Sequence, residues 1–579
     1  MADLTRKNKT AIPETFSIHK FGGINNSMSE AGEAKFMKNF RITDNFKLQR
    51  RPGSRLYCTF GSYGNIRGAW YGRYNNEEAL YVCAGNKIVK YDGVYTQIGT
   101  IGTNTGKVNI FPLHNRLYFF DGTEAYTYDT SVFGPAEPYK PILYVQVNEL
   151  QSYASEAQNL LTRQFRIQYN YNHTTYVFNY MPVESVQSLT INGADYTNAY
   201  DFAINPATGS LTVTAKSGVP ASGIVHVTCT MVPQCRKDEI FANKYHAVHN
   251  EDNDNVRLFL YGVNNTVYFT EDISKREGMY VTVGNKIVAG DPKNTITSIC
   301  RQFEDLVIFT ENDTWVINNP VKTADSVFRN TYHCKYSLSL ISSAVGNVGQ
   351  ANVRQIDYNL ISAAADGAYL WGITRLFDER NVKYISLPIR NNVNKDFWSG
   401  VIALDNRRDG EVWFYNDGDT WIYNYRTNVW YYYDNIAADG FVTTENVSYY
   451  SGAEMFIMDE NCDTDAGIPF DAAWESQYID FGLPQYTKSL QRLFVTLQPY
   501  SCLDEVKLIP DKGETAVFEN LNSSTVPVTH RLRLKINRCI FAQLILRAEE
   551  KVTVSGVKVE WVRGGEGNSL KGNSLKAFL

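Results

Sequence analysis

The sequence lacks the features by which membrane, secreted and many catalytic proteins are recognised. It has no run of 18 or more apolar residues, so no transmembrane helix is expected, and its start, MADLTRKNKT, lacks the apolar stretch of a secretory signal. The nine cysteines are scattered and never spaced C-x-x-C, which predicts reduced thiols and folding in a cytoplasm. A nucleophile elbow, a P-loop, a dinucleotide fingerprint and an H-E-x-x-H motif are all missing. We therefore expect a protein that is not an enzyme and that binds no cofactor.

Charge and helical periodicity are also scarce. Charged residues make up 20% of the chain, and the net charge of −5 argues against a protein that grips nucleic acid through a basic surface. A mildly acidic wall along which DNA slides stays compatible with that charge. Long periodic helical segments are missing, whereas 39 Tyr and 30 Phe favour half-buried strands. The composition predicts an all-β fold.

One motif recurs along much of the chain: an acidic or amide turn followed by an alternating aromatic strand. It appears as NKIVKYDG at 86–93, FFDGTEAYTYD at 119–129, FTENDTWVI at 309–317, ADGAYLWG at 365–372 and YNDGDTWIYNY at 415–425. Each copy has the pattern of a tight β-hairpin. Because the hairpin recurs, we predict a β-propeller of about six or seven blades, in which each blade is an antiparallel sheet.

Two regions depart from the blade motif. Residues 140–236 contain longer strands that are rich in Thr and Val, and we predict an inserted β-sandwich there. Residues 463–566 predict a C-terminal β-sandwich. The propeller is expected to comprise residues 21–139 and 237–462, between a flexible lead-in at 1–20 and a flexible tail at 567–579, in which GNSLK occurs twice.

His246 and His249 are the candidates for a metal site, with Glu251, Asp252 and Asp254 in the loop that follows. Their i, i+3 spacing suits a helix, but KYHAVHN indicates a strand that enters a polar loop. No third His or Cys stands nearby at ligand spacing, and the acidic stretch does not match an EF-hand. We expect a surface loop and no metal.

Two pairs of carboxylates are candidates for glycoside cleavage, Glu304 with Asp305 and Asp417 with Asp419. Adjacent residues of a strand point to opposite faces, which argues against the first pair. The stretch FYNDGDTW at 414–421 partly resembles the Asp-box of sialidase propellers, and this box is a turn device that supports the propeller more than an activity.

Ten aromatic residues lie close together in the sequence after residue 412. They are Trp413, Phe414, Tyr415, Trp421, Tyr423, Tyr425, Trp430, Tyr431, Tyr432 and Tyr433. Alternation along strands predicts that core packing accounts for about two-thirds of them. The remainder would suit a sugar- or protein-binding platform or a subunit interface.

The segment 21–57 precedes the first blade and combines several short signals. Ser27 and Glu30 have capping-box spacing, which predicts a short helix over about 29–38. FRI-TDN-FKL then predicts a hairpin that stops at the turn formed by Pro52 and Gly53.

This segment resembles the tail hub, nozzle or packaged-DNA stabilisation proteins of short-tailed bacteriophages. In that family a Gly-Gly-Ile near the start leads to an Asn-Phe or Asn-Met pair and then to Arg-Pro-Gly, and WESQYIDFGLPQYTKSLQRL at 474–493 is similar to strands that follow its propeller. The resemblance covers 21–57 and 474–493 by motif. The residues that carry it, as structural motif positions, are Gly22, Gly23, Ile24, Asn39, Phe40, Arg51, Pro52 and Gly53. The inserted sandwich departs from the family pattern.

The resemblance implies a structural tail protein of the virion, assembled in the host cytoplasm. It implies a homo-oligomer, a ring of six copies below the portal and adaptor proteins, through whose lumen double-stranded DNA passes without sequence-specific binding. Such a ring retains packaged DNA and conducts it during ejection. Two alternatives stay open: a carbohydrate-active propeller with accessory sandwiches, and a receptor-binding module at the tail tip.

Overall fold

The structure is a computed structural model of the chain. It describes residues 13–27, 30–136, 142–146, 153–157, 164–170, 175–176, 183–208, 210–216, 218–220, 223–231, 237–249, 256–270, 285–324, 332–374 and 379–566. In these residues it contains strands β1 to β50, a short helix α1 (Lys237–Ala242) and three 3-10 helices, η1 (Thr197–Ala199), η2 (Leu387–Ile389) and η3 (Lys395–Gly400). The prediction of an all-β fold is confirmed.

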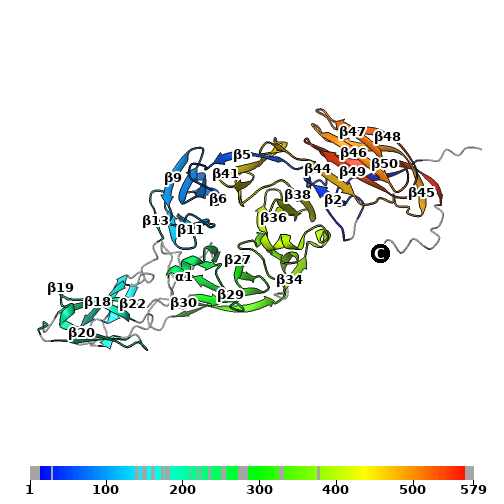
Figure 1. Ribbon diagram of the computed structural model, residues 1–579. Coiled ribbons are helices and arrows are strands. Elements are labelled where there is room, and N and C mark those ends of the chain that lie inside the picture. The colour runs from blue at the N-terminus through cyan, green and yellow to red at the C-terminus, as the bar shows by residue number, and fades with distance from the viewer. Residues whose placement is uncertain are drawn as a thin grey trace, which may run out of the picture. The chain divides into compact units, whose positions relative to one another are not determined.

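Seven four-stranded meanders follow one another in the part of the chain that the structure describes (Figure 1). They are β6–β9 (Ile66–Tyr74, Glu77–Ala84, Lys87–Tyr91, Tyr95–Thr100), β10–β13 (Asn109–Leu113, Arg116–Phe120, Ala125–Tyr128, Phe133–Pro135), β23–β26 (Tyr245–His249, Arg257–Tyr261, Thr266–Phe269, Lys286–Val288), β27–β30 (Ile296–Gln302, Asp305–Thr310, Thr314–Ala324, Tyr332–Ser342), β31–β34 (Arg354–Ile356, Asn359–Ala364, Gly367–Thr374, Glu379–Tyr384), β35–β38 (Ile402–Asn406, Glu411–Asn416, Asp419–Asn424, Val429–Tyr433), and β39–β41 (Gly440–Thr443, Val447–Ser451, Glu454–Asp459) with β5 (Gly53–Thr59). The last meander takes its fourth strand from the beginning of the chain, where β5 pairs antiparallel with β41.

The recurring turn motif forms the hairpins of these meanders. Between β36 and β37, Asn416 faces Asp419 across a two-residue turn, with Asp417 at φ 48° and Gly418 at φ 91°. Two consecutive positive φ values define the turn that matches the twist of paired strands, and Asp-Gly is a preferred sequence for it. The turn residues therefore act as the sequence predicts.

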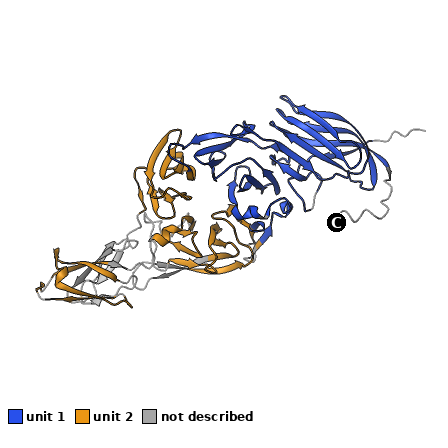
Figure 2. Ribbon diagram, in the orientation of Figure 1, with its two compact units in different colours: residues 1–65, 365–370, 382–579 blue, residues 66–364, 371–381 orange. Residues whose placement is uncertain are grey.

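The chain divides into two compact units (Figure 2): the first unit of this description is residues 66–364 with 371–381, orange and labelled unit 2 in the figure, and the second is residues 1–65 with 365–370 and 382–579, blue and labelled unit 1. In the first unit, the apolar residues of consecutive meanders pack together. Tyr81 and Ile88 of β6–β9 share a core with Leu117 and Phe119 of β10–β13. Phe111 and Tyr118 of β10–β13 share a second core with Leu258 of β23–β26.

The inserted region lies in the first unit and also consists of strands. Its sheets are β16-β22-β18-β19, β17-β21-β20 and β14-β15, with bounds β14 Ile142–Gln146, β15 Tyr153–Ala157, β16 Gln164–Asn170, β17 Thr175–Tyr176, β18 Val183–Ile191, β19 Ala194–Asp195, β20 Tyr200–Ile204, β21 Leu211–Ala215 and β22 Ile224–Met231. Leu189, Val213 and Val227 form part of one core. The region around the predicted boundary at 140–141, and residues 232–236 at its other end, lie outside the described residues.

The second unit contains two further groups of strands, formed by the beginning and the end of the chain. One sheet has the order β3-β4-β50-β45-β48, with β1 also paired to β50. The other group extends the meander β35–β38 into a nine-stranded sheet, which continues from β38 as β2-β44-β49-β46-β47. The bounds are β1 Glu14–Ile18, β2 Ala34–Lys38, β3 Phe40–Ile42, β4 Leu48–Arg50, β42 Thr464–Asp465, β43 Ile468–Pro469, β44 Ala472–Ser476, β45 Tyr486–Leu497, β46 Cys502–Pro510, β47 Ala516–Asn522, β48 Val528–Cys539, β49 Ala542–Ala548 and β50 Thr553–Glu566. Buried and exposed residues alternate along β48, so this strand has one core-facing and one exposed face.

The predicted helix over 29–38 is wrong. Residues 34–38 form β2, in which Met37 faces Trp474 of β44 in an antiparallel pair. Glu33, which follows the supposed capping box, instead accepts hydrogen bonds from the side chain of Asn25 and the backbone of Glu30. Pairing with a strand from the far end of the chain therefore overrides the local capping signal. A hairpin does follow FRI, but its second strand is residues 48–50 and not the predicted FKL, because Phe40 faces Arg50 and Ile42 faces Leu48 across β3 and β4.

Candidate functional site

The residues that carry the family resemblance all lie in the second unit, beside β38 and the strands after β41. Gly22 and Gly23 lead into Ile24, which is buried and donates its backbone N–H to the carbonyl of Trp430 at 2.7 Å. The α-carbon of Gly23 lies so close to the backbone of Trp430 that a side chain there would collide with it. The segment from Gly22 to Ile24 thus brings the beginning of the chain against β38.

Asn39 adopts a left-handed conformation, φ 55°, which Asn tolerates better than most residues. Its side-chain amide donates to Oδ1 of Asp434 at 2.6 Å and to the carbonyl of Asp471 at 2.7 Å. Its Oδ1 accepts from Nε of Arg51 at 2.9 Å and from the backbone N–H of Asp434 at 3.1 Å. Asn39 is fully buried, and all of its side-chain hydrogen-bonding atoms have partners.

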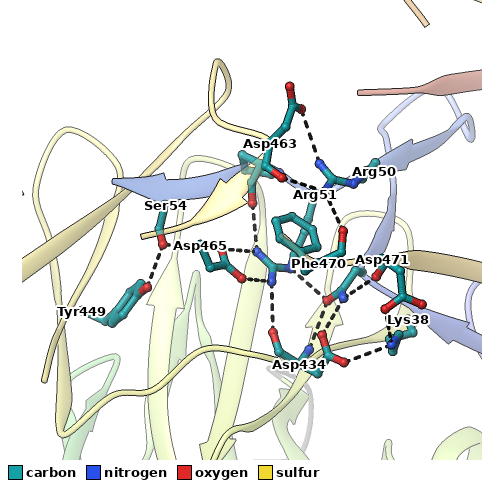
Figure 3. Close-up of polar contacts among 12 residues, drawn as sticks. Lys38, Arg50, Arg51, Ser54, Asp434, Tyr449, Asp463, Asp465, Phe470 and Asp471 are labelled. Carbon is teal, nitrogen blue, oxygen red and sulfur yellow. Dashed lines mark hydrogen bonds and ion pairs between the residues drawn. The ribbon is translucent and has the colours of Figure 1, made fainter. Parts of the chain in front are cut away.

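Arg51 forms the centre of this network (Figure 3). Its guanidinium meets the carboxylate of Asp465 with two parallel contacts, Nη1 to Oδ1 at 3.0 Å and Nη2 to Oδ2 at 2.5 Å. Nη1 also donates to the carbonyl of Pro52, and Nη2 to that of Asp434, both at 3.0 Å. With Nε on Asn39, the guanidinium uses all five of its N–H groups. The side chain of Arg51 is 0% exposed and that of Asp465 is 4% exposed, so the pair is shielded from water.

Two arginines enclose the ring of Phe470. The guanidinium carbons of Arg50 and Arg51 lie 3.9 Å and 3.8 Å from the centre of that ring. Arg50 also donates to the backbone carbonyls of Asp463 and Phe470, each at 2.9 Å. Cation–π contacts of this kind are favourable where the cation is removed from water. They fix the segment after β42 against the end of β4.

The remaining residues that carry the family resemblance provide close packing. Phe40 is fully buried, and Gly53 donates its backbone N–H to the carbonyl of Cys462 at 2.7 Å. A β-carbon on Gly53 would lie 2.8 Å from that carbonyl oxygen and closer still to the carbonyl of Thr464. Only glycine fits this position without a shift of the backbone.

We call the network of Asn39, Arg51, Asp434, Asp465 and Phe470 the anchor. Its contacts join residues far apart in the sequence: Asn39 and Asp434 are 395 positions apart, and Arg51 and Asp465 are 414 positions apart. The sequence identified Asn39 and Arg51 through the resemblance but gave no sign of the other three. Partners at such a separation leave no local spacing pattern, and an aspartate in a turn-rich stretch has no feature that distinguishes it from a surface residue.

A small polar cavity lies next to the anchor, lined in part by Pro52 and Tyr433. Its charged lining residues are Arg41, Arg408, Asp409, Glu411, Glu445 and Glu460. Arg41 binds Glu460 at 2.6 Å and donates to the side chain of Gln49 at 3.0 Å. The cavity has a volume of about 40 Å³, enough for a few water molecules but far below the roughly 300 Å³ at which small-molecule sites begin.

Glu411 is the carboxyl group most removed from water in this cavity. Its Oε2 accepts from the indole N–H of Trp413 at 2.7 Å and from Asn406 at 3.2 Å, and its Oε1 accepts from the hydroxyl of Tyr431. Burial raises the pKa of Glu411 above its ordinary value of 4.5, against the opposing effect of these donors. A carboxyl with a raised pKa beside other carboxylates is able to hold and release a proton.

The predicted metal candidates lie apart from this site, in the first unit. The ring of His246 stacks on Phe111 with 3.5 Å between ring centres, and burial lowers its pKa to about 3. Nε2 of His249 lies 2.8 Å from the carbonyl oxygen of Glu304. The acidic loop with Glu251, Asp252 and Asp254 lies outside the described residues. Among the residues that are described, no cluster of three or more His, Cys, Asp or Glu side chains is arranged to hold a metal ion.

The predicted carboxylate pairs lie at hairpin turns. Asp305 begins β28 directly after the turn that contains Glu304. Asp417 occupies the left-handed turn described above, and Asp419 accepts a hydrogen bond from the hydroxyl of Tyr432 at 2.5 Å. The structure thus places each pair at the end of a strand.

The aromatic cluster packs mainly in the core, as predicted. Eight of its ten members are buried, namely Trp413, Phe414, Tyr415, Trp421, Tyr423, Trp430, Tyr431 and Tyr433. Tyr425 and Tyr432 are partly exposed. The cluster therefore leaves little aromatic surface for a sugar or a partner.

In the described part of the chain, no helix has the length and apolarity needed to cross a membrane. No model of a protein family matches this chain, and no curated protein matches it. Similar solved structures include an exo-β-1,3-galactanase from Phanerochaete chrysosporium, at 9% identity and a TM-score of 0.17. The aligned region covers 82% of this chain and 100% of the galactanase chain. Another is a glycoside hydrolase at 9% identity and a TM-score of 0.21, for which the aligned region covers 87% of this chain and 100% of the hydrolase chain.

These comparisons correct one prediction. We expected a protein that is not an enzyme, whereas the similar structures are glycoside hydrolases, so a catalytic activity is open for this chain. At these TM-scores the similarity assigns no role to any residue.

Proposed function

We propose that this chain is a structural subunit of the tail of a short-tailed bacteriophage, present in the virion below the portal and adaptor proteins. The proposal includes a seven-bladed β-propeller, in which the seven meanders are the blades and β5 completes the last one. Six copies would form a ring that retains packaged DNA and conducts it during ejection.

The observation that supports the proposal is the anchor. The signature residues of the tail-protein resemblance are not scattered over the surface, because Asn39 and Arg51 share one buried network with Asp465. The network binds the beginning of the chain to the end of β38 and to β42, which follows the last meander. A ring subunit that carries pressure from packaged DNA needs such a connection, and recurrence of the signature in tail proteins is then explained by this mechanical role.

The mass of the assembly tests this proposal. The chain has a mass of 65.7 kDa, so a ring of six copies has a mass of about 390 kDa. We expect mass photometry to detect this species, either for the protein alone or after addition of the portal and adaptor proteins of its virion. A protein that stays at the mass of one chain with those partners present would overturn the proposal.

A second candidate is a carbohydrate-active protein, and the environment of Glu411 favours it. Glu411, a buried carboxyl with a raised pKa, lines one cavity with Asp409 and Glu460, and glycoside cleavage uses an acid of this kind together with a second carboxylate. The cavity admits no sugar at its present volume, so substrate binding would have to open it. Release of reducing sugar from bacterial surface polysaccharides that is lost in Glu411→Gln but kept in Glu445→Gln would support this candidate. No release by the wild type, or equal release by both variants, would exclude this site.

A further inference from the structure

The outer face of the sheet that contains β48, β45 and β50 carries an excess of positive charge, although the whole chain has a net charge of −5. Along β48 the exposed residues alternate with buried ones, and Arg531, Arg533 and Lys535 all lie on the exposed side. Leu534, between Arg533 and Lys535, and Ile536, which follows Lys535, are buried and face the core. The three cations therefore form one row on a single face.

The neighbouring strands extend this row into a patch, which we call the basic face. Arg492 of β45 pairs directly with Arg533, and Phe494 of β45 pairs with Arg531, so their side chains share that face. On the other side of β45, Lys558 of β50 lies opposite Phe494, with its ammonium 5.6 Å from the centre of the ring. The strands β50, β45 and β48 are consecutive neighbours in one sheet, and Figure 1 labels all three in the C-terminal region.

Few acidic side chains offset these charges. Glu560 of β50 lies opposite Arg492 and binds it at 2.9 Å, and it lies 4.0 Å from Lys558. In the described part of the chain, no ion pair joins Arg531, Arg533 or Lys535 to a carboxylate. The basic face thus presents five cationic side chains against one carboxylate, and three of the cations are exposed along β48.

We propose that the basic face binds the phosphate backbone of double-stranded DNA without sequence preference. Alternate residues of a strand are about 7 Å apart, so the row from Arg531 to Lys535 extends about 14 Å. One DNA strand presents about four phosphates over that length. Three of the five cations are arginines, whose planar guanidinium fits a phosphate with two hydrogen bonds.

The ends of the same chain do not provide the anionic partner. Residues 1–12 contain Arg6, Lys7 and Lys9 against one aspartate, and residues 567–579 contain two lysines and no acidic residue. Both segments are cationic and would be repelled by the basic face. The partner is therefore a separate molecule with a high density of negative charge.

A structural role for these charges is the competing explanation. β48 is at the end of its sheet, and charged residues on an edge strand prevent pairing with other chains. A charge of either sign would protect the edge, whereas Arg531, Arg533 and Lys535, at three successive exposed positions of this strand, are all positive. Replacement by glutamate keeps the protection of the edge and removes the attraction for phosphate, so the two explanations predict different results.

The test uses the full chain and a fluorescein-labelled duplex DNA of mixed sequence, with binding followed by anisotropy. Neutralisation of about four phosphates predicts that affinity falls about 150-fold between about 50 mM and about 200 mM salt. In Arg531→Glu/Arg533→Glu we expect affinity to fall at least about tenfold and the slope of log affinity against log salt to decrease by about 2.

The matched control is Lys507→Glu/Arg547→Glu, which changes the net charge equally on the sheet that contains β46 and β49. There Arg547 is paired with Glu505 at 3.8 Å and the exposed charges are of both signs. This control should bind DNA like the wild type, and circular dichroism should show that both variants are folded.

Three results would overturn the inference: no binding of DNA by the wild type at low salt, equal losses in the two variants, or preferential binding of poly-glutamate over DNA. The last would indicate an acidic protein as the partner. The inference is independent of the proposed tail role, because DNA binding is measured on the isolated chain. Failure to form a ring and failure to bind DNA are therefore separate results.

Discussion

Replacement of Asp465 by asparagine tests whether the anchor holds the beginning of the chain in place. Asp465→Asn keeps the size of the side chain but removes the negative charge that faces the guanidinium of Arg51. The arginine would stay buried with its charge uncompensated, because its other acceptors are neutral oxygens of Asn39, Pro52 and Asp434. Removal of one partner from a buried ion pair costs about 3–5 kcal/mol.

That cost applies to opening of the anchor region, since a chain of 579 residues with two compact units is not expected to unfold in a single step. Hydrogen–deuterium exchange measured by mass spectrometry is therefore the suitable assay. A cost of about 3 kcal/mol raises the exchange rate of amides protected by local opening about 100-fold. We expect this increase in residues 39–54 and 462–471.

Residues 66–128 provide the internal control, because no residue of the anchor lies among them, and their exchange should not change. Arg51→Lys should give a smaller increase than Asp465→Asn, because it keeps the charge and loses the planar pair of contacts and the stacking on Phe470. Exchange in the anchor region that stays within a factor of three of the wild type in Asp465→Asn would refute the reasoning. The anchor would then be a feature of packing without energetic importance.

Three further results are expected. Gly53→Ala should lower the thermal stability of the second unit, because its β-carbon would meet the carbonyl of Cys462, whereas Gly134→Ala, which meets nothing within 4 Å, should leave thermal stability unchanged. Protection of the amides around Glu411 from hydrogen exchange should decrease as pH rises from about 4.5, because the folded state favours the protonated carboxyl. Glu411→Gln should abolish this pH dependence. If the dependence is unchanged in that variant, another group causes it. His246 should show no protonation step between about pH 5 and about pH 8 when the exchange of its ring C–H is followed, since its pKa is held at about 3, and a step near pH 6.5 would place the ring in water.

The turn chemistry was the part of the fold that the sequence predicted best. Asp417 and Gly418 are local signals, because the residues that determine a two-residue turn are the turn itself. The same holds for the burial of Trp413 and Trp430, since alternation along a strand needs only the strand. Recurrence of these signals was enough to predict an all-β fold.

The errors occurred where distant parts of the chain interact. Ser27 and Glu30 have the spacing of a helix cap, but the strand that pairs with residues 34–38 comes from residues 472–476. The carboxylate that pairs with Arg51 likewise lies 414 positions away, in Asp465. A net charge averaged over the chain likewise does not reveal a row of cations on one strand such as β48.

Electron cryo-microscopy of the chain mixed with the portal and adaptor proteins of its virion tests the central claim most directly. We expect closed six-fold rings that extend the portal channel. Within each subunit, the anchor joins Asn39 and Arg51 to Asp465. Single chains that do not associate with those proteins, or a density for bound sugar beside Glu411, would contradict it.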